Sequence, residues 1–190
     1  MFTDPVLLDL QKKFKIKEYW GGQENLFLDL IENIIGQQLS IKVAKIINGR
    51  FLNLFQNQNP TPQEVIAIPH ETYRAQGLSN AKARYVKNIA QAVIDGELLI
   101  DKFEKMSDEE IKAQLVKIKG IGNWTAEMFL IFSMKRPDVF SLGDLGLRSA
   151  IEKLYGIKRD NLKKIEELSK TWAPHRTLAS RLLWSSLDNA

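Results

Sequence analysis

The chain of 190 residues contains no cysteine, and this absence removes several classes of site at once. Disulfide frameworks, thiolate zinc sites, cysteine nucleophiles and iron–sulfur clusters all require the missing residue. Histidine is almost as scarce, because His70 and His175 are the only two and lie far apart in the sequence. A metal centre built from histidines is therefore not expected.

Long apolar runs are lacking as well. No stretch approaches the roughly 20 residues that span a membrane, and the first residues, with Asp4 and Pro5, do not read as a secretory signal. We therefore expect an intracellular protein without membrane contact, cytoplasmic in a prokaryote or nuclear in a eukaryote. The balance of 27 Lys and Arg against 23 Asp and Glu gives a net charge of +4, which permits a nucleic-acid partner without requiring one.

Helical periodicity is what the sequence has in abundance. Leu7, Leu10 and Phe14 recur at the spacing of one helix face, and many later segments repeat this pattern. Residues 61–64 and 107–110 each form a capping box, the signature of a helix start. No stretch shows the sustained alternation of a strand. These patterns predict an all-α fold of several helices with short connections.

The most informative segment covers residues 115–126 and reads LVKIKGIGNWTA. Gly120 and Gly122 flank one apolar residue, so the backbone can turn tightly and approach a partner closely. The first N–H groups of the following helix carry the positive end of its dipole, which suits a phosphate. The alternative is an ordinary helix–turn–helix corner. If the phosphate site is real, additional donors lie nearby in Lys117, Lys119 and Asn123.

Several segments in the expected order resemble the helix-hairpin-helix DNA glycosylases, the superfamily that combines such a hairpin with a Gly/Pro-rich loop and a catalytic aspartate. Within it, the sequence is most similar to the 3-methyladenine DNA glycosylase II, or AlkA-type, branch. The resemblance covers roughly residues 25–187. Besides the hairpin, the matching segments are IIGQQLS at 34–40, DVFSLGD at 138–144, and WAPHR at 172–176 with the later Trp184.

The resemblance implies an all-α helix-hairpin-helix glycosylase fold with two helical lobes flanking a DNA-binding cleft. Residues 30–137 would form a central lobe with the hairpin, and residues 1–29 plus 138–190 the lobe with the catalytic aspartate. The implied partner is double-stranded DNA containing damaged bases, bound by a monomer. Two departures stand out: the chain is too short for the β-rich N-terminal domain of AlkA-type enzymes, and residues 142–145 read LGDL where that branch often has PDDY.

Asp144 is the candidate catalytic carboxylate. Cleavage of an N-glycosidic bond builds positive charge on the deoxyribose, which a carboxylate can stabilise while it orients or deprotonates water. Bifunctional members carry a Schiff-base lysine two residues after the second glycine, where this chain has Trp124. The resemblance therefore implies a monofunctional glycosylase that excises alkylated purines such as 3-methyladenine in base excision repair. Asp144 is also the expected cap of the next helix, and the two roles are compatible.

The resemblance further implies a base pocket lined by Trp124, Trp184 and Met128, the last at a position where AlkA-type enzymes have a tyrosine. Trp20 and Trp172 are expected in the core. Gln38 matches the side chain that fills the space left by a flipped base. The full set of expected DNA contacts is Gln37, Gln38, Leu39, Lys117, Lys119, Gly120, Ile121, Gly122, Asn123 and Thr125.

The reaction needs no cofactor on this reading. The family implies a structural monovalent cation, Na⁺ or K⁺, held by the backbone carbonyls of Val116, Ile118 and Ile121. Two alternatives stay open: a helix-hairpin-helix module that binds DNA without chemistry, and a glycosylase for another lesion, such as a mismatched, deaminated or oxidised base. The substitution Asp144→Asn separates the first alternative from an enzyme.

Overall fold

A computed structural model describes residues 2–16 and 25–188 of the chain. Regular structure in this described part is helical throughout and includes no strand, which confirms the all-α prediction. No described helix is long and apolar enough to cross a membrane. The elements in chain order are α1 (Pro5–Lys13), α2 (Leu26–Gly36), α3 (Ile41–Leu52), α4 (Pro62–Ala67), α5 (His70–Ala75), α6 (Asn80–Ile94), the 3₁₀ helix η1 (Ile100–Lys105), α7 (Asp108–Leu115), α8 (Asn123–Met128), the π-helical turn η2 (Phe129–Ser133), α9 (Leu145–Tyr155), α10 (Leu162–Lys170) and α11 (Arg176–Asp188).

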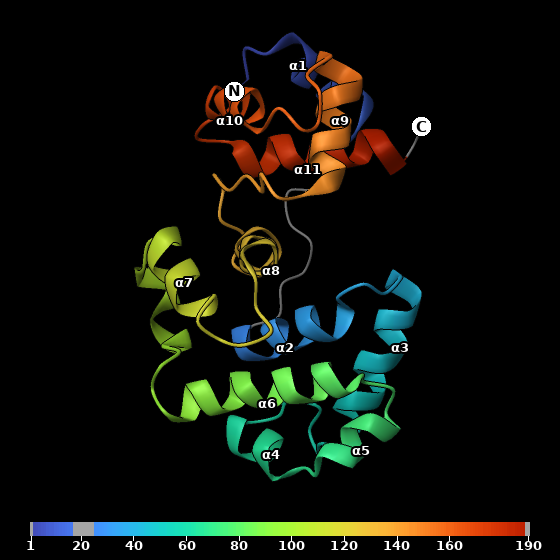
Figure 1. The fold of residues 1–190 in the computed structure, drawn as a ribbon, viewed down its shortest axis with the longest axis vertical. Coiled ribbons are helices and arrows are strands. Elements are labelled where there is room, and N and C mark those ends of the chain that lie inside the picture. Colours follow the sequence, from blue (N-terminus) through green and yellow to red (C-terminus); the bar gives the residue numbers. More distant parts are fainter. Residues whose placement is uncertain (1, 17–24, 189–190) are drawn as a thin grey trace. The chain divides into compact units, whose positions relative to one another are not determined.

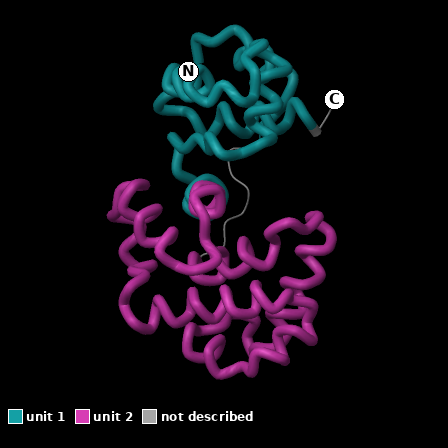
Figure 2. Tube along the Cα trace, viewed as in Figure 1, with its two compact units in different colours: residues 1–22, 130–190 teal, residues 23–129 magenta. Residues whose placement is uncertain are grey.

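Two compact units divide the chain, and one of them is discontinuous in sequence (Figure 2). The central unit is Gln23–Phe129, and the terminal unit combines Met1–Gly22 with Leu130–Ala190. The sequence placed the boundaries near residues 30 and 137, whereas they fall before α2 and inside the helical run of α8 and η2. The first turn of α2 belongs with the rest of its helix because Phe27 and Leu28 are already buried.

In the central unit, α6 lies between α2 on one side and α4 with α5 on the other (Figure 1). Helix α2 is the most buried element, since seven of its 11 residues are inaccessible. It also packs against α3. Both predicted capping boxes are present, at Thr61 with Glu64 and at Ser107 with Glu110, so local sequence alone fixes where α4 and α7 begin.

In the terminal unit, α11 packs against α1 and α9 around an apolar core. Asp4 organises one side of this core, because its Oδ1 accepts hydrogen bonds from the first turn of α1. Its Oδ2 accepts from the Tyr155 hydroxyl at 3.0 Å and from the Trp172 indole Nε1 at 3.1 Å. Trp172 is 1% exposed, which confirms its predicted core position. Trp20 lies outside the described residues.

Candidate active site

Asp144 is the N-cap residue of α9 and is nearly buried, at 9% exposure. Its Oδ1 accepts a hydrogen bond from the backbone N–H of Leu147 at 2.8 Å. The same oxygen accepts from the indole Nε1 of Trp184 on α11 at 3.0 Å. The capping role expected from the sequence is therefore present, and a second donor from a distant helix fixes the orientation of the carboxylate.

The surroundings of Asp144 leave little space. A side chain at Gly146 would place its Cβ 3.1 Å from Asp144 Oδ1 and 3.3 Å from Trp184 Cδ1, so the small residue lets the carboxylate and the indole meet. Phe132 of η2 also stacks on the Trp184 ring, with ring centroids 5.7 Å apart. Sequence reasoning identified Trp184 and missed both Gly146 and Phe132, which nothing in the local pattern distinguishes from ordinary packing residues.

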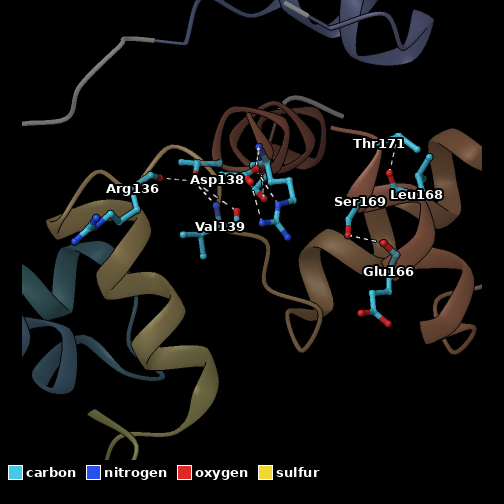
Figure 3. A network of polar contacts seen from close by, with 10 residues as sticks. Arg136, Asp138, Val139, Glu166, Leu168, Ser169 and Thr171 are labelled. Atoms are coloured by element: carbon cyan, nitrogen blue, oxygen red, sulfur yellow. Dashed lines mark hydrogen bonds and ion pairs between the residues drawn. The ribbon is translucent and has the colours of Figure 1, made fainter. Parts of the chain in front are cut away.

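The loop that leads to Asp144 is fastened to the start of α11 (Figure 3). Arg176 donates to both carboxylate oxygens of Asp138, from Nε at 2.8 Å and from a terminal guanidinium nitrogen at 2.9 Å. The Thr177 hydroxyl donates to the Arg136 carbonyl at 2.6 Å and accepts from the Val139 N–H at 3.1 Å. Helix α11 thus holds the beginning of the loop through its first turn and the end of the loop through Trp184.

The sequence alone could not say whether Arg176 pairs with an acidic side chain or with a phosphate. In the structure it pairs with Asp138, and this two-point contact has a fixed geometry because guanidinium and carboxylate match as planar groups. The hydrogen bonds from Arg176, together with its charge, lower the pKa of Asp138 despite partial burial. Asp138 is consequently ionised at neutral pH and keeps the loop fastened.

In the central unit, the hairpin turns at Gly120 with a φ of +116°, a region that side chains disfavour. A Cβ at this position would lie 2.6 Å from Cδ1 of Tyr85, so α6 and the turn approach each other as closely as glycine allows. The Asn88 side chain of α6 also donates to the Lys119 carbonyl at 3.0 Å. Gly120 therefore has a defined reason to be glycine, and Tyr85 and Asn88 are supporting residues that the sequence did not reveal.

Gln37 joins the hairpin to the turn after α2. Its side-chain Nε2 donates to the Thr125 hydroxyl at 2.9 Å and to the Gly120 carbonyl at 3.3 Å. The ammonium of Lys82 in turn donates to the backbone carbonyls of Gln37, at 2.6 Å, and Ile35, at 2.8 Å. Gln37 and Thr125, both expected to contact DNA, thus bond to each other inside the protein.

The other expected DNA contacts lie largely at the surface of the central unit. Gln38 is exposed and has a φ of +57°, so the turn that it forms is held in a conformation that few side chains adopt. Leu39 is half-buried beside it, and Gly120 is half-buried in the hairpin. Ile121 is buried, at 5% exposure, and anchors the turn. The exposed members on the hairpin are Lys117, Lys119, Gly122 and Asn123.

The proposed base-pocket residues divide between the two units. Trp124 and Met128 lie one helical turn apart on α8 of the central unit, whereas Trp184 lies on α11 of the terminal unit with Asp144. Trp124 is 44% exposed, so a large part of its aromatic surface is accessible. Met128 is 7% exposed and belongs to the buried core.

The expected cation site is formed by backbone carbonyls of the hairpin. The described residues contain no cluster of three His, Asp or Glu side chains that could hold a metal ion. The carbonyls expected to hold a monovalent cation belong to Val116, Ile118 and Ile121, and that of Ile118 also accepts the Ile121 N–H at 3.0 Å. Neutral carbonyl oxygens suit a hard cation of low charge, so the donor set is compatible with Na⁺ or K⁺.

A comparison with models of protein families identifies the family of this chain. The model of the HhH-GPD superfamily base excision DNA repair proteins matches residues 31–175, a span that contains the hairpin, its supporting helix α6 and Asp144. The chain belongs to the HhH-GPD superfamily. Trp184, the indole that orients Asp144, lies beyond the matched span of this HhH-GPD chain.

Curated relatives and solved structures agree with this assignment. The HhH-GPD chain is 38% identical over 161 residues to DNA-3-methyladenine glycosylase 1 of Schizosaccharomyces pombe, which covers 83% of this chain and 71% of that protein. It is 31% identical over 166 residues to the putative DNA-3-methyladenine glycosylase YfjP of Bacillus subtilis, covering 84% of this chain and 58% of the relative. It therefore spans little more than half the length of YfjP.

Two solved structures extend the similarity to nearly the whole chain. A DNA-3-methyladenine glycosidase from Bacillus halodurans has a TM-score of 0.85 at 33% identity, with 96% of this chain and 84% of that chain covered. The S. pombe 3-methyladenine DNA glycosylase Mag1, solved in complex with abasic DNA, has a TM-score of 0.83 at 32% identity, with 98% and 93% covered. The predicted helix-hairpin-helix glycosylase fold is confirmed.

Proposed function

We propose that this chain is a monofunctional DNA glycosylase that removes alkylated purines, such as 3-methyladenine, from double-stranded DNA in base excision repair. The observation that carries the proposal is the setting of Asp144. A nearly buried carboxylate, fixed by the Trp184 indole and by the end of α9, follows a loop that is itself fastened to α11. The names of the relatives, and the abasic DNA bound to one of them, support DNA as the partner.

The chemistry follows from the charge that develops in the reaction. As the bond between C1′ and the base nitrogen breaks, the sugar becomes oxocarbenium-like, and a carboxylate placed beside it lowers the energy of that state. Asp144 also orients the attacking water and accepts one of its protons, while the water oxygen bonds to C1′. The products are the free base and an abasic site. Fixing the carboxylate in advance avoids the cost of reorienting it during the reaction.

Alkylated purines suit a site with one carboxylate. A 3-methyladenine or 7-methylguanine base carries positive charge in DNA, so it leaves as a neutral molecule and needs no separate acid to protonate it. Aromatic faces attract such a cationic base by about 0.5–2 kcal/mol per contact. Trp124 offers such a face on α8, and the Trp184–Phe132 stack offers aromatic surface next to Asp144.

The residue types on α8 support a mechanism without a lyase step. Trp124 occupies the place of the Schiff-base lysine of bifunctional relatives, and α8 contains no lysine at all. Lys119 lies on the other side of Gly120, where its carbonyl bonds to Asn88. The hairpin is assigned the phosphate contacts, and a Na⁺ or K⁺ held by its carbonyls would add positive charge toward a phosphate. That ion would position DNA and take no part in bond cleavage.

The test is a base-release assay on DNA treated with a simple methylating agent. The free bases are separated and identified, and the same DNA is examined for strand breaks and for covalent trapping by borohydride. Release of 3-methyladenine or 7-methylguanine, with intact strands and no trapped complex, is the expected result. No release from methylated DNA, together with release of uracil, mismatched thymine or an oxidised base from oligonucleotides that contain them, would overturn the assignment of alkylated purines. A trapped complex would overturn the monofunctional mechanism.

A further inference from the structure

Helix α3 is unusually poorly covered for a helix of a folded unit. Only one of its 12 residues, Phe51, is buried. Three of its aliphatic side chains are exposed: Ile41 at 89%, Val43 at 41% and Ile46 at 47%. Ile41 exceeds the other exposed large apolar residues of the described chain in accessibility. Such a surface on a single helix is available for contact with a partner.

The charge on α3 is of one sign. Lys42, Lys45 and Arg50 are exposed, and the sequence contains no carboxylate between Glu32 and Glu64. Helix α6, which packs against α2 as α3 does, likewise carries cations and no carboxylate. Because acidic side chains are missing, the potential over α3 is positive, and it complements a polyanion better than a protein surface of mixed charge.

The position of α3 in the chain indicates that the polyanion is duplex DNA. Ile41 follows the exposed Gln38 by three residues, so their Cα atoms are at most about 11 Å apart. The minor groove of B-DNA is about 6 Å wide, and base pairs are spaced about 3.4 Å apart. If Gln38 enters the base stack, the first turn of α3 must therefore lie over the duplex. The Gln37 side chain fixes this turn relative to the hairpin, so the α3 helix start cannot swing away freely.

We propose that one face of α3, formed by Ile41, Lys42, Lys45 and Ile46, is a second duplex-binding surface next to the hairpin. These residues share one side of the helix because they lie one turn apart in pairs. Ile41 packs against the deoxyribose edges beside the flipped nucleotide, and the two lysines contact phosphates. This inference rests on the proposed function in assigning Gln38 to the base stack, but its binding surface is testable on undamaged DNA.

The first test measures the electrostatic contribution of α3 to duplex binding. The double substitution Lys42→Gln/Lys45→Gln is compared with the parent in duplex binding over a range of salt concentrations. Two lost phosphate contacts should lower the slope of log affinity against log salt by about 1.8. The matched control is Lys102→Gln/Lys105→Gln, which removes two exposed lysines from η1 of the same unit and should leave the slope unchanged. An unchanged slope for the α3 variant, or an equal drop for both, would overturn the proposal.

The second test measures the contribution of the apolar side chain of Ile41 to duplex binding. Ile41→Ser should weaken binding to an abasic-site duplex about 5-fold. Since Ile41 is 89% exposed, thermal stability should stay at the parent value. Ile94→Ser, at a 40% exposed position near the end of α6, is the control and should bind like the parent. Ile41→Ser that keeps parental affinity but loses self-association or capture of another protein would assign the face to a protein partner and contradict the proposal.

Failure of this inference is distinguishable from failure of the proposed function. If methylated DNA yields free bases but both α3 variants bind as the parent does, only the α3 surface is wrong. If no base is released while the salt slope still falls as expected, the surface holds and the enzymatic assignment is wrong.

Discussion

In the terminal unit, the candidate catalytic group is a carboxylate that is almost withdrawn from solvent and held by two donors on one oxygen. In the central unit, the candidate DNA-binding groups are exposed cations and the backbone of a tight turn, supported from below by Tyr85, Asn88 and Gln37. In the terminal unit, the hydrogen bonds hold the carboxylate in one orientation and leave little of it exposed. In the central unit, the cations stay exposed, and the hydrogen bonds stabilise the conformation of the turn.

Substitutions in the two units should change different measurable quantities. Changes around Asp144 should alter the rate of base release with little effect on duplex affinity, because positioning a reacting group acts on the chemical step. Changes in the hairpin and its supports should alter affinity and its salt dependence, because phosphate contacts position DNA without entering the reaction.

The largest effect is expected at Gly120. Gly120→Ala combines a φ of +116° with overlap of the new Cβ and the Tyr85 ring, so we expect a loss of about 2–4 kcal/mol in unfolding free energy and a large loss of duplex binding. Urea denaturation measures the unfolding free energy, and a titration with duplex DNA measures binding. Gly122→Ala is the matched control for stability, because its Cβ would meet no atom within 4 Å in the protein. An equal loss of unfolding free energy in the two variants would contradict the role given to Tyr85.

An intermediate effect with a pH signature is expected at Asp138. The Arg176 hydrogen bonds lower the pKa of this carboxyl, so their contribution is complete above the unfolded value of about 3.9 and is lost as pH falls through the lower folded value. Asp138→Asn should therefore cost about 1.5–3 kcal/mol at pH 7, and the difference from the parent should shrink below about pH 4. It should also slow base release while duplex affinity stays the same, since the loop before Asp144 loses its anchor.

The control for Asp138 is Asp160→Asn, at an exposed position of the same unit. Unfolding is followed by urea titration at several pH values. A stability difference between the Asp138 variant and the parent that does not depend on pH would show that the ion pair is not its source.

The smallest effect is expected at Gln37. Gln37→Ala removes the two side-chain bonds that tie the turn after α2 to the hairpin, and it should weaken duplex binding roughly 10-fold, or about 1.4 kcal/mol. Base release at saturating enzyme should fall much less, because Asp144 lies in the other unit. Gln63→Ala, at an exposed position of α4, serves as the control. A fall in the saturated rate with unchanged affinity would reverse the assignment of Gln37.

What the sequence predicted well is governed by local interactions. The capping boxes of α4 and α7 and the cap at Asp144 involve residues within a few positions of one another. The all-α class and the hairpin glycines follow from the same short-range logic. The catalytic role proposed for Asp144 rests on the family resemblance, because its capping position alone does not indicate it.

What the sequence missed depends on long-range pairing. The bond between Asp138 and Arg176 joins residues that are 38 positions apart, and that between Gln37 and Thr125 joins residues 88 apart. The family resemblance implies DNA contacts for both Gln37 and Thr125, whereas their mutual hydrogen bond depends on the tertiary structure and has no local sequence pattern.

The most direct test of the central claim compares Asp144→Asn with Asp160→Asn in two assays on the same preparations. One assay measures single-turnover release of 3-methyladenine from methylated DNA, and the other measures affinity for an abasic-site duplex. We expect Asp144→Asn to lose about 100-fold or more in release rate while its affinity stays within a few-fold of the parent, and Asp160→Asn to match the parent in both. An Asp144→Asn variant that releases base at the parental rate would contradict the assignment of the chemistry to this carboxylate.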